Sequence, residues 1–207
     1  MAYVLGFFAA DGYITKNKNG GLYWCIQITD RELLYRIRDS LGSTHKISKR
    51  IMKAGEKPLY RLQIGSTELC HDLFKLGFNE NKTKRLNFPE IANKYLPDFV
   101  RGYFDGDGNV WCGLVHKERK TKTFVISTVF TSCSREFLDG LRLSLESVNI
   151  CKGVLRENKD NYHRLTYSVI SSLKIFNFMY NGSVFSKNGL FLNRKKIVFE
   201  KYIKMRA

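Results

Sequence analysis

The most constraining feature of this sequence is a nine-residue segment that occurs twice. The segment 4–12 returns 96 positions later as the segment 100–108, and the two copies align without a gap. Each copy is a short apolar run that ends in Asp-Gly, so the duplication supplies one acid per copy, Asp11 and Asp107. A chain built in this way is expected to fold as two related halves.

Small residues lie four positions apart in both copies, and this spacing predicts how the two runs meet. Residues four apart share one face of a helix. Two helices with such stripes can approach more closely than the usual separation of roughly 8–10 Å between axes. We therefore expect a helix interface that places the two acids side by side, formed by the small residues Gly6, Ala10, Gly102 and Gly106.

The duplicated pattern resembles the motif of the LAGLIDADG homing endonucleases, in the single-chain form that carries two motifs. The resemblance implies a meganuclease that functions in intron homing and cuts both strands of a specific DNA site. It implies phosphodiester hydrolysis with Mg²⁺, for which Ca²⁺ or Mn²⁺ can substitute, and a staggered cut that leaves 3′ overhangs. The expected protein is a monomer, and the expected partner is a long asymmetric DNA duplex.

The flanking segments predict the same order of elements in each half. Alternating apolar and polar residues indicate strands, and the helical patterns begin at capping residues and end at glycines. In the first half, Thr29 or Asp30 is placed to cap a helix that Gly42 ends. The elements expected after the first motif are a strand at 22–29, a helix at 30–41, strands at 45–53 and 59–65, and a helix from Ser66 to Gly77.

The second half repeats these landmarks, with a longer and more basic loop at 115–123. The segment 124–133 matches the first strand, and Arg164 matches Arg61. Strands that come in pairs joined by short turns favour antiparallel hairpins over parallel crossovers. The predicted fold is α+β, with two pseudo-symmetric αββαββα halves at 1–95 and 96–207, motif helices packed at their interface, and antiparallel sheets that form a DNA-binding saddle.

The charge of the chain indicates a polyanionic partner. Thirty-five Lys and Arg residues oppose nineteen Asp and Glu residues, which leaves a formal charge of +16. So large an excess is repulsive without a polyanion, and it is spread over both halves. Double-stranded DNA is the favoured partner, and a membrane surface is the weaker alternative. No apolar run reaches the roughly 18 residues of a spanning helix. We expect a soluble, intracellular protein, in a bacterial cytoplasm or an organelle.

The outward sheet faces are expected to contact DNA. Arg and Gln side chains can form paired hydrogen bonds with guanine and adenine, and Thr and Ser can bond to bases or phosphates. Each residue could instead belong to an ordinary solvated surface. The candidates are Tyr23, Gln27, Thr29, Arg61 and Gln63 in the first half, and Ser127, Thr131, Arg164, Thr166 and Ser168 in the second. On the strand at 22–29 this face would also include Cys25.

The two acids are expected to form a metal site. They end their helices, where carbonyl groups concentrate negative charge, and two nearby carboxylates repel each other. Mg²⁺ suits such a place because it is held by one or two carboxylates together with waters and substrate phosphate. The alternative makes Asp11 and Asp107 ordinary turn residues, with Gly12 and Gly108 as left-handed helix caps.

The resemblance assigns further roles at this centre. It implies that Asp11 and Asp107 are catalytic metal ligands, and that the preceding residues Ala10 and Gly106 belong to the same metal site. Gln27 matches the strand residue that positions water in the family, whereas its counterpart Thr131 departs from that pattern. The active-site lysine matches Lys82 or Lys84 in the first half and Lys195 or Lys196 in the second, with Lys82 and Lys195 as the selected candidates.

Two further observations bear on alternatives. Asp105 stands where the first motif has Ala9, and we expect it to contact a basic neighbour or to cap a group near the joint between the halves. The odd number of scattered cysteines argues against a disulfide framework.

The rival function is a nucleic-acid binder that does not cleave, either an intron RNA maturase or a DNA-binding regulator. Intron RNA therefore remains an alternative partner.

Overall fold

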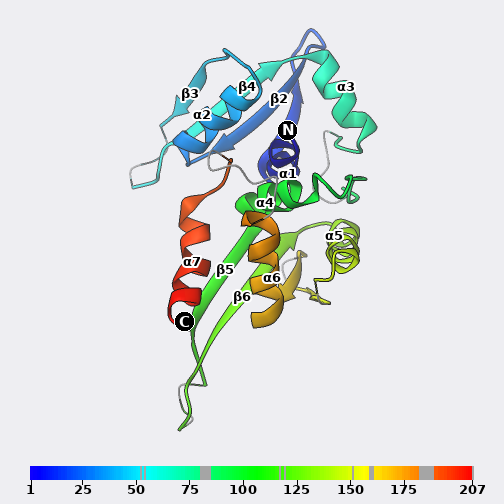
Figure 1. Cartoon of the computed structure of the whole chain (residues 1–207). Coiled ribbons are helices and arrows are strands. Elements are labelled where there is room, and N and C mark those ends of the chain that lie inside the picture. Colours follow the sequence, from blue (N-terminus) through cyan, green and yellow to red (C-terminus); the bar gives the residue numbers. More distant parts are fainter. Residues whose placement is uncertain are drawn as a thin grey trace.

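Two copies of one arrangement meet through their first helices, as the computed structural model shows (Figure 1). The structure describes residues 1–206 except 52, 54, 80–84, 117, 119, 151, 159–160 and 182–188. The first half comprises α1 (Ala2–Asp11), β1 (Gly12–Lys16), β2 (Leu22–Ile28), α2 (Arg31–Ser40), β3 (Ile47–Arg50), β4 (Leu59–Gly65) and α3 (Thr67–Lys75). The second comprises α4 (Leu96–Asp107), β5 (Gly108–Val115), β6 (Thr123–Ser132), α5 (Arg135–Ser147), β7 (Val154–Glu157), β8 (His163–Tyr167), α6 (Val169–Tyr180) and the additional helix α7 (Asn193–Lys204).

Each half contains one antiparallel sheet with the same strand order. The orders are β1-β2-β4-β3 and β5-β6-β8-β7. The registers also correspond, because Gly12 faces Ile26 in one sheet and Gly108 faces Phe130 in the other. The predicted α+β fold with two related halves is therefore confirmed.

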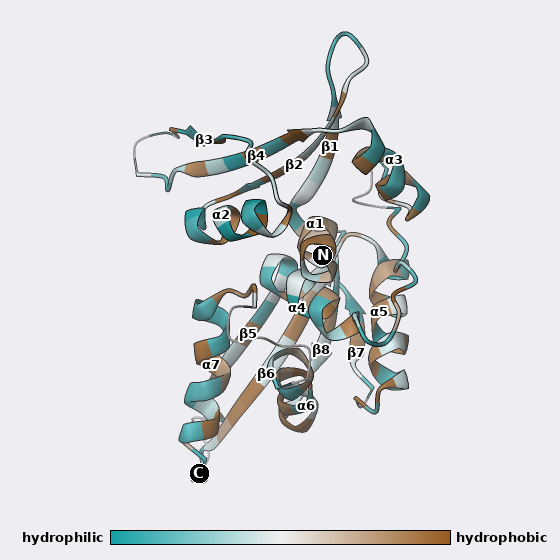
Figure 2. Ribbon diagram, turned by 45° about the horizontal axis from the view of Figure 1, so that its top comes forward, coloured by the Kyte–Doolittle hydropathy of each residue, from teal (hydrophilic) through white to brown (hydrophobic). Residues whose placement is uncertain are grey.

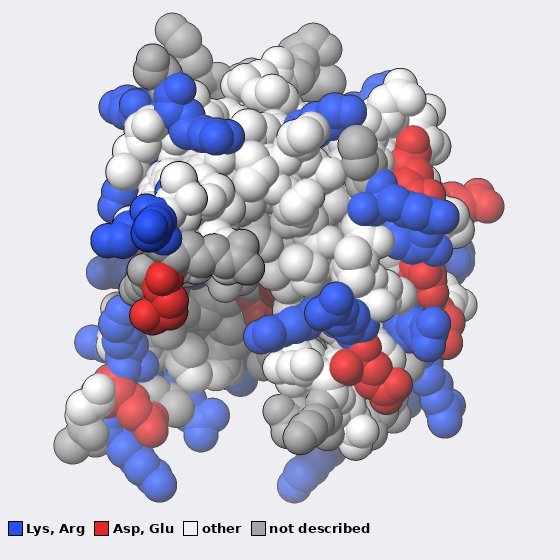
Figure 3. All heavy atoms as spheres, turned by 90° about the horizontal axis from the view of Figure 1, so that it is seen from below, with Lys and Arg blue, Asp and Glu red and all other residues white. Residues whose placement is uncertain are grey.

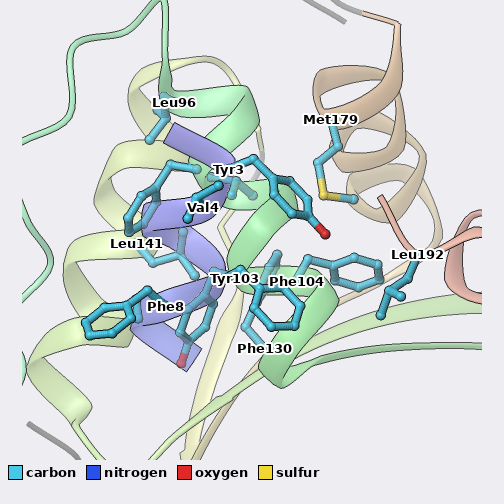
Figure 4. Packing of buried hydrophobic residues seen from close by; sticks show 14 of the residues in the cluster. Tyr3, Val4, Phe8, Leu96, Tyr103, Phe104, Phe130, Leu141, Met179 and Leu192 are labelled. Atoms are coloured by element: carbon cyan, nitrogen blue, oxygen red, sulfur yellow. The ribbon is translucent and has the colours of Figure 1, made fainter. Parts of the chain in front are cut away.

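The motif helices α1 and α4 pack directly against each other because glycines remove the side chains at their crossing. A Cβ atom built on Gly6 would lie 2.0 Å from the carbonyl oxygen of Phe99, and one on Gly102 would lie 2.0 Å from that of Tyr3. Neither position could hold a larger residue without moving backbone. Aromatic and aliphatic side chains from both helices then fill the surrounding core, together with residues of β6, α5 and α6 (Figure 4).

Gly12 and Gly108 let a strand begin directly where each motif helix ends. Both have extended backbones, with φ and ψ of −84° and 157° at Gly12 and −87° and 158° at Gly108. The left-handed cap considered from the sequence is therefore wrong. A Cβ atom would instead lie 2.0 Å from the ring of Phe8 at Gly12 and 2.3 Å from the ring of Phe104 at Gly108.

Helices cover one face of each sheet and leave the other face open. The strands alternate accordingly, since Leu62 and Phe130 are fully buried whereas Arg61 and Arg164 are exposed. Hydrophobic residues concentrate on α1 and between the layers, and α2 is largely hydrophilic (Figure 2). Within the described ranges, no helix is both long enough and apolar enough to cross a lipid bilayer.

Several local expectations are corrected by the structure. The strand expected at 45–53 is confined to Ile47–Arg50. Cys25, expected on the open face, is fully buried, because it lies between Tyr13 and Gln63 in the neighbouring strands. Asp30 occupies the cap position of α2, but its side chain accepts no capping hydrogen bond from a backbone amide of the helix. It pairs instead with Arg194, at 3.2 Å.

Candidate active site at the crossing helices

The C-terminal ends of α1 and α4 place Asp11 and Asp107 at the junction of the two halves. Both acids are exposed, although the helices that carry them are mostly buried. A Cβ atom on Gly106 would lie 2.3 Å from that of Ala10 and 3.2 Å from Oδ2 of Asp11. The carboxylate of Asp11 thus lies against the end of the opposite helix, next to the residue that precedes Asp107.

A hollow of about 190 Å³ adjoins Asp11. Gln27 and Thr29 line it from the end of β2, and Gly106 and Arg194 line it from the second half. The structure thus brings together Asp11, Gln27 and Thr29 of the predicted site. Thr29 lies just beyond the end of β2, where it lines the hollow.

A second hollow, of about 130 Å³, occupies the equivalent place beside Asp107. Thr131 lines it at the position that corresponds to Gln27, and Ala10 lines it from the opposite motif helix. Each acid therefore has a polar strand residue of its own half and a small residue of the other helix beside it. The two hollows differ chemically because one offers an amide where the other offers a hydroxyl.

Lys195 lies beneath this centre, where it closes the C-terminal end of α4. Its ammonium group lies within hydrogen-bond distance of the carbonyl oxygens of Phe104 at 2.7 Å, Asp105 at 2.8 Å, Gly106 at 3.3 Å and Gly108 at 2.6 Å. Because the group has three N–H donors, at least one of them is shared between two carbonyls. Carbonyls in the last turn of α4 lack partners within the helix. The carbonyl of Phe104 also accepts from the amide of Gly108, which begins β5. Burial lowers the pKa of the Lys195 amine to about 8, although the charge of Asp105 opposes this shift.

Asp105 is buried beside Lys195 and joins both halves. Its Oδ2 accepts a hydrogen bond from the hydroxyl of Tyr3 and another from the backbone amide of Leu192, both at 2.8 Å. Its Oδ1 has no hydrogen-bond partner in the described part of the chain. Burial raises the pKa of this carboxyl to about 6, and the hydrogen bond from Tyr3 opposes the shift. Asp105 thus caps a backbone group near the joint, one of the two roles expected for it.

The segment that contains Leu192 and Lys195, residues 189–195, fastens the second half to the first, and we call it the strap. Arg36 of α2 donates to the carbonyl of Gly189 at 2.6 Å, and Arg101 of α4 donates to that of Leu190 at 2.9 Å. Arg194 pairs with Asp30 of the first half. The strap therefore ties α2 to the end of α4.

A matching contact runs from the first half to the second. The hydroxyl of Ser134, which caps α5, donates to the carbonyl of Leu86 at 2.7 Å and accepts from the amide of Phe137 at 3.2 Å. Ser134 corresponds to Asp30, so each half uses the residue before its second helix to hold the tail of the other half. Lys82 and Lys84 lie outside the described residues.

The open face of the first sheet carries rows of polar side chains. The row nearest the centre contains Gln27, Arg61 and Ser48, which face one another across β2, β4 and β3. The next row contains Tyr13, Cys25 and Gln63, and Tyr23 lies in the row beyond. Four predicted DNA-contacting residues thus share one face, namely Tyr23, Gln27, Arg61 and Gln63.

The second sheet repeats the inner row with more positive charge. Thr131, Arg164 and Arg156 face one another across β6, β8 and β7. Thr166 and Ser127 lie in the following rows of the same face, and the hydroxyl of Ser127 donates to the carbonyl of Tyr167. Ser168 lies beyond β8, at the cap position of α6.

The open-face residues of the outer strands β1 and β5 were not among the predicted DNA-contacting residues. Tyr13 and Thr15 of β1, and Asn109 and Trp111 of β5, lie on these faces by their registers with β2 and β6. The signal was present, because both strands begin at the Gly of the Asp-Gly pair that recurs at the 96-residue offset. The view from below shows Lys and Arg around the periphery of the molecule, with fewer acids among them (Figure 3).

Solved structures of LAGLIDADG meganucleases have the same fold. I-AabMI bound to uncleaved DNA aligns over 98% of this chain and 88% of that protein, with a TM-score of 0.60 and 16% identity. I-DmoI in complex with DNA and Mn aligns over 88% and 97%, with a TM-score of 0.60 and 16% identity. I-SmaMI bound to an uncleaved DNA target with calcium ions aligns over 99% and 89%, with a TM-score of 0.61 and 15% identity.

Sequence relatives occur in the archaeon Methanocaldococcus jannaschii. The chain is 32% identical to the DNA-directed RNA polymerase subunit Rpo1C over 154 residues, which are 72% of this chain but 16% of that protein. It is 27% identical to the replication factor C small subunit over 183 residues, which are 85% of this chain but 9% of that protein. The matches thus span a small part of each relative. The LAGLIDADG-like domain family matches residues 1–76 and 95–179, and the chain therefore belongs to the LAGLIDADG family.

Proposed function

We propose that this protein is a site-specific DNA endonuclease that cuts both strands with a divalent metal ion. The observation that carries the proposal is the pair of equivalent hollows at the ends of α1 and α4, each with one exposed acid and one polar strand residue. The duplication relates the two centres, and each is placed to act on the phosphodiester bond of one DNA strand. The proposed cut is staggered and leaves 3′ overhangs.

The donor groups at this centre fit a hard cation such as Mg²⁺. Asp11 and Asp107 supply carboxylate oxygens, and the helix ends supply the backbone carbonyls of Ala10 and Gly106. Lys195 uses one of the two lone pairs of the Gly106 carbonyl, which leaves the other for a ligand. Among the described residues, no group of three or more His, Cys, Asp or Glu side chains could hold a metal. The site thus needs water and substrate phosphate to complete coordination, as Mg²⁺ sites commonly do.

The residues of the chain would orient the reactants. The metal would supply Lewis acidity and lower the pKa of a bound water. Gln27 and Thr131 would hold water at their respective hollows by hydrogen bonds. Lys195 would fix the backbone around Asp107 and place a positive charge beneath the phosphate, where negative charge develops.

The open faces of the two sheets are proposed to bind the DNA on either side of this centre. Arg61 and Arg164 occupy equivalent rows next to the two acids, where they can reach bases or phosphates of the two half-sites. The related meganucleases solved with DNA support this placement, as does the formal charge of +16. The two faces differ in sequence, so the target is expected to be asymmetric and the enzyme to act as a monomer.

A plasmid library with randomised inserts tests the proposal. Incubation with Mg²⁺ should linearise one sequence class, and Asp11→Asn or Asp107→Asn should abolish double-strand cutting while DNA binding survives. Asp72→Asn is the matched control, because Asp72 is exposed on α3 and pairs with Lys75. Equal loss of cutting in the control, or cutting by both site variants, would overturn the proposal. Intron RNA that displaces no DNA and blocks no cutting would argue against a shared RNA site.

A further inference from the structure

The hairpin of β5 and β6 is longer than its counterpart in the first half. Its strands have 8 and 10 residues, against 5 and 7 in β1 and β2. Figure 1 shows this hairpin extending past the helices of its own half. Three more residues per strand lengthen the open face by about 10 Å. That distance corresponds to about three base pairs of a DNA strand.

The added part of the open face begins with the row of Gly113 and Val125, which follows the row of Trp111 and Ser127. Trp111 faces Ser127 and Gly113 faces Val125, and these two rows point away from α7. Helix α7 covers the opposite face, where Phe124 stacks on Tyr202 at 5.4 Å. Trp111 remains 48% exposed. A Cβ atom on Gly113 would lie 2.6 Å from Cζ2 of Trp111, so the indole lies along the strand over Gly113.

The corresponding positions of the first half have a different chemistry. By register, Trp111 corresponds to Thr15, Ser127 to Tyr23 and Val129 to Cys25, while Val125 lies beyond the end of the shorter hairpin. The outer row of the first half therefore contains side chains that can form hydrogen bonds, those of Thr15 and Tyr23. The other half presents what we call the apolar strip, formed by Trp111, Val125 and Val129. Ser127 lies between the two valines on β6, and its hydroxyl donates to the carbonyl of Tyr167.

Positive charge bounds the apolar strip at both ends. Arg156 and Arg164 lie at its inner end, in the row beside Thr131, and both are exposed. Lys120 and Lys122 are exposed beyond its outer end. A partner that fits must offer anionic groups at both ends and apolar groups between them. The major groove of DNA does so wherever thymine presents its C5-methyl group between phosphates.

We propose that the apolar strip reads thymine methyl groups in the outer part of one arm of the target. This inference rests on the proposed function, since it names what one end of the DNA-binding face recognises. The outer part of that arm would be rich in A·T pairs and selected by apolar contact. The equivalent part of the other arm would be read by hydrogen bonds from residues such as Thr15 and Tyr23.

The test begins with selection of bound duplexes from a randomised pool in EDTA, which keeps the DNA intact. The wild type should enrich a sequence with thymines at the outer positions of one arm. Replacement of those thymines by uracil removes only the methyl groups and should weaken binding about fourfold for each methyl group that the apolar strip covers. The double variant with Trp111→Ser and Val125→Thr should lose both the preference and the sensitivity to uracil. Thr15→Ala is the matched control, and it should change selection on the opposite arm alone.

Three outcomes decide the matter. Thymine enrichment on one arm, with sensitivity to uracil that the double variant abolishes, supports the inference. An enriched sequence without thymine preference in either outer arm, or with no response to uracil, overturns the inference and leaves the proposed nuclease intact. Failure to bind any duplex would overturn the proposed function and this inference with it.

Discussion

Tyr3 and Asp105, which are 102 residues apart in the chain, are joined by a 2.8 Å hydrogen bond from phenol to carboxylate. Both side chains are almost fully buried, at 3% and 2% exposure. The bond connects α1 of the first half to α4 of the second. Burial of Tyr3, followed by the charge of Asp105, raises the pKa of this phenol well above its ordinary value, so it remains a donor at neutral pH.

Removal of this donor should weaken the junction of the halves. Tyr3→Phe keeps the ring but leaves a buried carboxylate with one hydrogen bond fewer, and should lower the free energy of unfolding by about 1.5–3 kcal/mol. Tyr35→Phe is the control, because its hydroxyl contacts Arg31 at an exposed position. Urea unfolding followed by circular dichroism measures both variants. Equal urea midpoints for Tyr3→Phe and Tyr35→Phe would show that the buried hydrogen bond does not stabilise the fold.

The same carboxyl should give stability a defined pH dependence. Its pKa rises from 3.8 to about 6 on folding, so the folded state binds a proton more tightly than the unfolded state. The resulting stabilisation is present below pH 4 and is lost as pH rises through about 6. Asp105→Asn cannot titrate, and its free energy of unfolding relative to wild type should increase by on the order of 2 kcal/mol between pH 4 and 7. A pH-independent difference between the two proteins would refute this assignment.

The crossing of α1 and α4 should tolerate no side chain at its glycines. Gly6→Ala or Gly102→Ala would force the helices apart, because each new methyl group would meet a carbonyl oxygen at 2.0 Å. We expect a loss of about 3 kcal/mol or more, or failure to fold. At Gly42, whose φ is 61°, a Cβ atom would meet nothing within 4 Å. Gly42→Ala should therefore cost only about 1–2 kcal/mol of backbone strain. Thermal unfolding of the three variants provides the comparison.

Lys195 should matter both for stability and for the proposed reaction. Lys195→Met keeps much of the side-chain volume but removes the three N–H donors that four carbonyl groups share, which should cost about 2–4 kcal/mol. Lys201→Met, at an exposed position of the same helix, is the control. Single-turnover cleavage should slow at least about tenfold in Lys195→Met, with little change in DNA affinity, because electrostatic groups act mainly on the transition state. If Lys195→Met changes DNA affinity but leaves the single-turnover cleavage rate unchanged, Lys195 has no part in the reaction.

The equivalent arginines Arg61 and Arg164 allow a matched test of DNA contact. If each neutralises one phosphate, alanine at either position should reduce the slope of log affinity against log salt by about one. If one reads a base instead, its loss should relax sequence preference in a single arm and leave the slope unchanged. Lys75→Ala on α3 controls for the general loss of charge. If the slopes of log affinity against log salt for the two arginine variants match that of the control, neither arginine contacts the DNA.

The duplication and the local periodicity were sufficient to predict the layout of both halves. Helix ends at Gly42 and Gly77 followed from glycine, and both residues do have positive φ angles. The glycine spacing in the motifs also predicted a close helix crossing, because a missing side chain is visible in the sequence. These features depend on residues near one another in the chain.

The errors concern contacts between distant segments. Cys25 alternates correctly with its neighbours but is covered by Tyr13 of a strand that was not assigned. Asp30 looked like a helix cap, yet its carboxylate pairs with Arg194, 164 residues away. The four carbonyl partners of Lys195 depend on how α7 is docked against α4, and no local pattern encodes that docking.

The strap belongs to the second half by its position in the sequence, but it contacts the first half. Residues 189–195 are encoded with the second half, but they hold α2 of the first half through Arg36 and Asp30. An exchange of halves between related proteins at the 95/96 boundary would therefore replace this fastening together with the second half. The natural unit of recombination is a first half that keeps its own matching strap, so successful hybrids should have two crossover points rather than one.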